Sequence, residues 1–109
     1  MASWSNAVSL QILISEDDAV DGVPLHQALV RAAREAGLAG AKSMRGIMGY
    51  GRSRHIHETW RGFSYDLPVV VEIVDTEAQI DAFMPTVERL RAGALVIRQR
   101  VEVLQPGPC

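Results

Sequence analysis

The sequence predicts an α+β fold in which four strands and two helices share one core. Period-two alternation of apolar residues indicates strands near both ends of the chain, and a β-branched run indicates another. Two further segments repeat apolar residues at helical spacing. The order is strand–helix–strand–strand–helix–strand. With right-handed crossovers, this order gives the split βαβ, or ferredoxin-like, arrangement: a four-stranded antiparallel sheet with two helices on one face.

The first strand and the first helix follow from the amino-terminal third of the chain. Residues 8–15 alternate in the manner of a strand, and the acidic segment SEDDAVDG then predicts a loop. Pro24 suits the first helical position, where its missing N–H costs no hydrogen bond. Gly37 is placed to end the helix in a left-handed conformation. The expected apolar stripe is Leu25, Ala28, Leu29, Ala32, Ala33 and Ala36.

The two middle strands differ in strength. Residues 41–48 predict a weaker strand because Gly46 interrupts it. Pro68 opens the run VVVEIVD, which is typical of a strand buried on both faces. Together with Leu13, this run places apolar side chains on the sheet face that the helices do not cover. An apolar face of this size usually marks an interface, so we expect a homo-oligomer, with dimer and trimer both open.

The second helix and the last strand complete the pattern. Thr76 and Gln79 have the spacing of a capping box. Pro85 predicts a kink or a looser helix, and Gly93 ends the helix. Alternation over residues 95–103 predicts the final strand. The apolar stripe of the helix is Ile80, Phe83, Met84, Val87 and Leu90.

Composition narrows the class of protein. The 109 residues suit one compact domain, and the net charge of −2 provides no basic field for nucleic acid. No apolar run approaches the ~20 residues that cross a bilayer. The amino terminus lacks the basic start of a secretory signal, and the lone Cys109 cannot form an internal disulfide. We therefore expect a cytoplasmic protein.

The segment Gly49–Leu67, GYGRSRHIHETWRGFSYDL, is the candidate functional region. A loop of this length without its own helix or strand is uncommon in a compact domain and is usually functional or disordered. Glycines let backbone N–H groups approach an anion, and arginine can bind it bidentately; a strand exit that needs flexible glycines is the alternative. The expected ligand-binding residues are Gly49, Tyr50, Gly51, Arg52 and Arg54. The basic cluster Arg45, Arg52, Arg54 and Arg61 has few acids near it in sequence, Glu58 and Asp66.

Other chemistry is less well supported. His55, His57 and Glu58 could hold zinc or copper if the segment is extended, but exposed loop histidines are the favoured interpretation. Glu72 and Asp75 flank an apolar strand and are candidates for paired carboxylates. The simpler interpretation is that Glu72 faces a polar interface or pairs with an arginine and that Asp75 helps to start the following helix. No nucleophile, base and orienting group occur together, so we expect a protein that is not an enzyme.

Three motifs in order resemble the PII signal-transduction proteins: GYGR, HETWRGFSY and LPVVVEIVD. The chain resembles more closely the PII-like family known as domain of unknown function 190. That family shares the helix pattern PLxxAxVxxAREAGLAGA, the strand exit RGIMGYG and the strand DLPVVVEIVD. The likeness extends from about Val8 to Val103.

The resemblance implies a homotrimer with its sheets facing inward and ligand clefts between subunits. It also implies a mobile T-loop that responds to a nucleotide and engages a membrane transporter or an enzyme. The loop residues that would contact a partner are His55, His57, Glu58, Trp60, Arg61 and Tyr65.

Two positions depart from the PII pattern. Trp60 replaces the tyrosine that can be modified, and Ala94 stands where a phosphate-binding lysine would fall. The basic carboxy-terminal segment is replaced by EVLQPGPC. The resemblance therefore implies a small anionic ligand, such as an adenine nucleotide, bound through Gly51 and Arg52 rather than in the usual ATP mode. The alternative is a metal-binding trimer similar to the divalent-cation tolerance proteins, with His55 and His57 as ligands.

Overall fold

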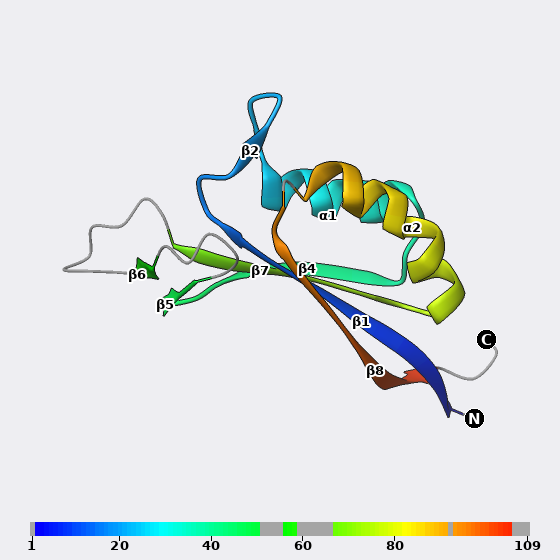
Figure 1. Cartoon of the computed structure of the whole chain (residues 1–109). Helices are drawn as coiled ribbons and strands as arrows, with labels where there is room; N and C mark the ends of the chain where they lie inside the picture. Colours follow the sequence, from blue (N-terminus) through cyan, green and yellow to red (C-terminus); the bar gives the residue numbers. More distant parts are fainter. Residues whose placement is uncertain (1, 51–55, 59–66, 92, 106–109) are drawn as a thin grey trace.

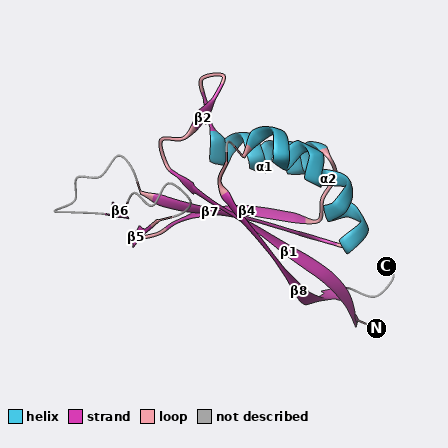
Figure 2. Ribbon diagram, viewed as in Figure 1, coloured by secondary structure: helices cyan, strands magenta, loops and turns pink. Residues whose placement is uncertain are grey.

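The structure, a computed structural model, describes residues 2–50, 56–58, 67–91 and 93–105. Within them, an antiparallel sheet in the order β4-β7-β1-β8 has both helices on one face (Figure 1). Figure 2 shows the same two layers coloured by secondary structure. The predicted ferredoxin-like fold is confirmed. Its strands are β1 (Ser3–Ser15), β4 (Gly40–Arg45), β7 (Pro68–Asp75) and β8 (Leu95–Gln105), and its helices are α1 (Leu25–Glu35) and α2 (Glu77–Leu90).

The core lies between the sheet and the helices. In the register of β1 and β7, Leu10 faces Ile73, Ile12 faces Val71 and Ile14 faces Val69. All six are buried, and each contributes about 1.5–3 kcal/mol relative to an exposed side chain. The helices cover these central strands with the following buried residues: Leu25, Leu29, Ala33, Ile80, Phe83 and Val87.

Helix α1 differs slightly from its prediction. Pro24 has an extended ψ of 132° and is the N-cap, so the helix begins one residue later than expected. Gly37 has φ of 78°, which confirms its left-handed role. Ala36 was expected on the apolar stripe, but it is exposed because it follows the last helical residue. Val30 packs against the core and was not predicted.

The predicted cap of helix α2 by Thr76 is confirmed, although the Thr76 N–H donates to the Asp75 carboxylate and not to the Gln79 side chain of a capping box. The Gln79 N–H donates to the Thr76 hydroxyl oxygen at 3.2 Å. The helix then continues through Pro85 to Leu90, and Gly93 follows with φ of 83°. The proline is therefore accommodated within one helix.

The strands differ from their predictions in length and burial. β1 and β8 pair from Ser3 and Gln105 at one end to Leu13 and Leu95 at the other, well beyond the predicted boundaries. Burial along β7 alternates, so the expectation that both of its faces are buried is wrong for the single chain. The second face of β7 lies on the side of the sheet that the helices do not cover, which we call the open face.

Two short hairpins occur where loops were predicted. In the acidic segment, β2 (Ala19–Val20) pairs with β3 (Val23–Pro24) across Asp21 and Gly22, both with positive φ. In the long loop, β5 (Met48–Gly49) pairs with β6 (His57–Glu58). The expectation that this loop has no strand of its own is wrong. No helix in the described part of the chain is long and apolar enough to cross a membrane.

Candidate functional site

Backbone hydrogen bonds at Gly46, Leu67 and Pro68 hold the two ends of the long loop at the edge of the sheet. We call this region the neck of the loop. The Gly46 N–H, just after β4, donates to the Pro68 carbonyl oxygen at 2.7 Å. The Glu16 N–H, just after β1, donates to the Leu67 carbonyl oxygen at 2.7 Å. The neck lies at the end of the sheet opposite the two chain termini (Figure 1).

The glycines of the strand exit pack closely against the Pro68 ring. A Cβ at Gly46 would lie 3.0 Å from Pro68 Cγ, and one at Gly49 would lie 3.4 Å from Pro68 Cβ. Neither glycine has a positive φ. The requirement for glycine at Gly46 is therefore steric, which differs from the conformational flexibility considered for this segment.

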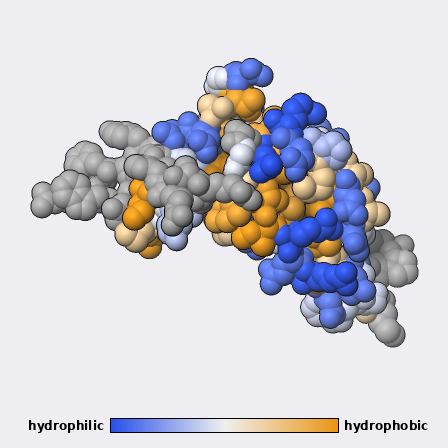
Figure 3. All heavy atoms as spheres, in the orientation of Figure 1, coloured by the Kyte–Doolittle hydropathy of each residue, from blue (hydrophilic) through white to orange (hydrophobic). Residues whose placement is uncertain are grey.

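The β5–β6 hairpin carries exposed apolar side chains. Ile47, Met48, Tyr50 and Ile56 are between 52% and 80% exposed. Figure 3 shows apolar atoms at this end of the molecule. Sequence reasoning selected Tyr50 but missed the other three, because a short apolar run such as Ile47–Met48 is also typical of a buried strand.

The structure describes only some of the predicted site residues. Gly49 pairs with His57 and Met48 with Glu58, so a predicted ligand-binding residue and two predicted partner-binding residues share one hairpin. The remaining predicted residues lie outside the described part of the chain: Gly51, Arg52, Arg54, His55, Trp60, Arg61 and Tyr65.

The alternative metal site stays a prediction. Among the residues that the structure describes, no three His, Cys, Asp or Glu side chains are grouped to hold a metal ion. His55, one of the two proposed ligands, lies outside those residues.

Arg45, the described member of the basic cluster, is already paired. Its Nη2 lies 2.8 Å from Glu16 Oε1. The arginine side chain is 68% exposed and the glutamate side chain 20% exposed. Glu16 is far from the cluster in sequence, so a count of neighbouring acids missed it.

A polar row crosses the open face of the sheet. The Ser9 hydroxyl donates to Glu72 Oε2 at 2.7 Å, and Lys42 Nζ lies 3.2 Å from Glu72 Oε1. The Ser9 hydrogen bond, followed by contact with Lys42, lowers the pKa of Glu72 against the opposing effect of burial. The sequence predicted an arginine as the basic partner of Glu72, and this is wrong: the partner is Lys42, which lies directly opposite Glu72 in the register of β4 and β7.

Glu72 and Asp75 do not form a carboxylate pair. In the alternating strand β7, residues an odd number of positions apart face opposite sides of the sheet. Asp75 instead accepts hydrogen bonds from the N–H groups of Thr76 at 2.6 Å and Ala39 at 2.9 Å. Asp75 therefore supports the start of α2, as the simpler interpretation held.

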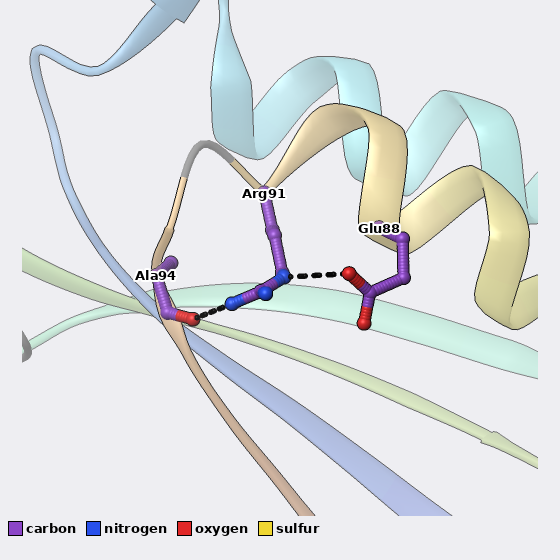
Figure 4. Close-up of polar contacts among 3 residues, drawn as sticks. All are labelled: Glu88, Arg91 and Ala94. Carbon is purple, nitrogen blue, oxygen red and sulfur yellow. Dashed lines mark hydrogen bonds and ion pairs between the residues drawn. The ribbon is translucent and has the colours of Figure 1, made fainter.

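The turn between α2 and β8 is held by an arginine (Figure 4). Arg91 Nη1 donates to the Ala94 carbonyl oxygen at 2.9 Å, and Arg91 Nε donates to Glu88 at 3.2 Å. The guanidinium beside Ala94 thus supports the turn itself. Ala94 is the position where the PII pattern has its lysine. The cation beside it, Arg91, therefore has a structural role in the turn.

Comparison with known proteins places the chain in a family. The DUF190 family model, described as an uncharacterised ACR, matches residues 7–103. A UPF0166 protein of Aquifex aeolicus (strain VF5) is 39% identical over 97 residues, covering 87% of this chain and 90% of the relative. A UPF0166 protein of Methanocaldococcus jannaschii is 31% identical over 90 residues, covering 81% and 82%.

Solved structures share the fold at low sequence identity. CPII of Thiomonas intermedia K12, a nitrogen regulatory PII-like protein bound to ADP, AMP and bicarbonate, has a TM-score of 0.60 at 15% identity. The match covers 93% of this chain and 91% of CPII. A protein of Thermus thermophilus described as PII-like and signalling has a TM-score of 0.62 at 13% identity, covering 94% and 91%. The chain therefore belongs to the DUF190 family and has the ferredoxin-like fold of PII-like proteins.

Proposed function

We propose that this protein is a PII-like regulator that assembles as a homotrimer and binds a small anionic ligand, with an adenine nucleotide as the first candidate. The ligand would lie in clefts between subunits, close to Gly49, Tyr50, Gly51, Arg52 and Arg54. Occupancy would be reported to a partner, a transporter or an enzyme, through the loop of residues 49–67. The protein would act by binding and not by catalysis.

The open sheet face is the observation that carries this proposal. The helices cover only the other face, and on the open side Met44 stays 47% exposed and Ile97 42% exposed in the single chain. Its apolar members surround the Ser9–Glu72–Lys42 row: Leu13, Met44, Val70, Val74, Leu95, Ile97 and Val101. A face of this composition favours association with further copies.

The choice of ligand is supported by sequence and by analogy. The glycine and arginine residues from Gly49 to Arg54 suit an anionic group. CPII, which has a similar fold, is described as bound to ADP and AMP. Because Ala94 stands in place of the phosphate-binding lysine of the PII pattern, we propose ADP or AMP before ATP.

Isothermal titration of the purified protein with ADP, AMP and ATP tests the proposal. We expect saturable binding of ADP or AMP. Arg52→Ala and Arg54→Ala should each weaken it about ten- to a hundredfold, the usual effect of removing a charged hydrogen bond to a phosphate. Arg31→Ala, an exposed arginine on α1, is the matched control. Absence of heat with all three nucleotides in folded protein would remove the nucleotide from the proposal.

A further inference from the structure

Glu16 contacts both sides of the loop neck. Its backbone N–H donates to the carbonyl oxygen of Leu67, the residue before β7, at 2.7 Å. Its carboxylate lies 2.8 Å from the guanidinium of Arg45, the last residue of β4. One residue at the end of β1 therefore holds the chain where it leaves the sheet and where it returns.

The geometry of the sheet explains how Glu16 reaches so far. β7 lies between β1 and β4 in the sheet order. Arg45 is opposite Val69, and Ser15 is opposite Pro68, so the Glu16–Arg45 pair spans the start of β7 from one neighbouring strand to the other. The Gly46 N–H contacts the Pro68 carbonyl oxygen beside this pair.

We propose that Glu16 is the positioning residue of the loop. Its carboxylate holds Arg45, its N–H holds Leu67, and together these contacts fix the separation of the two chain segments that enter the loop. Loss of the carboxylate charge would open the neck and weaken ligand binding at the segment that follows it. The second consequence rests on the proposed function; the first does not.

Amide hydrogen exchange measured by NMR on the full-length protein tests the first consequence. The reporters are the N–H groups of Gly46 and Glu16, which form the two neck hydrogen bonds. In Glu16→Gln and Arg45→Gln we expect both to exchange about two- to fivefold faster, the change that loss of an exposed ion pair allows in local opening. Asp81→Asn is the matched control, because it removes the 2.9 Å pair with Arg98 between α2 and β8.

A charge exchange separates positioning from a general loss of stability. The double variant Glu16→Arg with Arg45→Glu keeps the pair in reversed order and should return exchange at both amides toward the wild-type rate. Unchanged exchange in Glu16→Gln, or equal acceleration in Asp81→Asn, would overturn the proposal. A folded double variant that exchanges as fast as the single variants would also overturn it.

Titration of the same variants with ADP tests the second consequence. We expect Glu16→Gln to bind ADP about two- to fivefold more weakly and the double variant to recover affinity. Equal affinity in wild type and Glu16→Gln would show that the neck does not position the ligand site. If wild-type protein does not bind ADP, the proposed ligand is wrong, whereas the exchange rates of the free protein still decide the role of Glu16.

Discussion

The hydrogen bond between Ser9 and Glu72 shows how one residue can alter the chemistry of a sheet face. Ser9 is 2% exposed, so its hydroxyl is held where few other acceptors can reach it. Glu72 accepts this bond on one oxygen and contacts Lys42 on the other. The carboxylate is therefore stabilised in its charged form among apolar neighbours, and its pKa is lowered.

This lowered pKa predicts a pH-dependent stability. The folded pKa of Glu72 lies below its unfolded value near 4.5. The carboxylate therefore contributes fully to the free energy of unfolding above pH 4.5, and this contribution is lost as the pH falls through the folded pKa. Ser9→Ala should cost about 1 kcal/mol of unfolding free energy at pH 7, and this difference should shrink below about pH 4. Urea unfolding at fixed protein concentration measures it.

Ser5→Ala provides the control for this experiment. Ser5 lies on the same strand and the same face, but the contact of its hydroxyl is a 3.4 Å hydrogen bond from Gln105. We expect Ser5→Ala to lower the free energy of unfolding slightly, by an amount that does not change with pH. A pH-independent loss in Ser9→Ala as well would contradict the assigned role of the carboxylate.

Packing against Pro68, the first residue of β7, sets the point at which strand β4 ends. β4 ends at Arg45, and Gly46 then passes the Pro68 ring so closely that no side chain fits without a shift. The sequence predicts one strand over residues 41–48 that Gly46 weakens. In the structure Gly46 separates β4 from β5, because the chain must pass Pro68 at that position.

We predict that Gly46→Ala destabilises the fold by about 1–3 kcal/mol, because the new Cβ would lie 3.0 Å from Pro68 Cγ. Gly40→Ala, at the first residue of the same strand, has no atom within 4 Å of the added Cβ and should be nearly neutral. Thermal unfolding of both variants measures the difference. Equal stability of the two would show that the Pro68 ring moves aside at little cost.

The whole molecule has one covered and one open side. The helices bury the centre of the sheet, whereas Ile97 on the open side is 42% exposed in the single chain. Arg100 lies on the same strand but faces the other side, since the two are an odd number of residues apart. The proposed trimer would bury Ile97 and leave Arg100 exposed.

Light scattering after size-exclusion chromatography tests this assembly. Wild-type protein should have three times the 11.9 kDa mass of the chain. Ile97→Glu places a charge in the proposed interface and should produce monomers, whereas Arg100→Gln should remain a trimer. If Ile97→Glu and wild type have the same mass, the open face is not the interface between copies.

The sequence by itself determined the order of the two helices and the four strands of the main sheet, the ends of the helices at Gly37 and Thr76, and the helix-facing core of the sheet. These features depend on local periodicity and on single residues such as Gly37 and Thr76, whose preferences act within a few positions. It also identified the segment Gly49–Leu67 as the candidate site, from composition and from resemblance to a family.

The tertiary structure alone decided how that segment is joined to the sheet. The contacts of Glu16 with Arg45 and Leu67, and of Ser9 with Glu72, connect residues far apart in sequence and follow from strand order and register. Periodicity predicts which face a side chain occupies, but not which neighbour stands beside it. The strand pairing that brings these neighbours together is fixed only when the whole sheet forms.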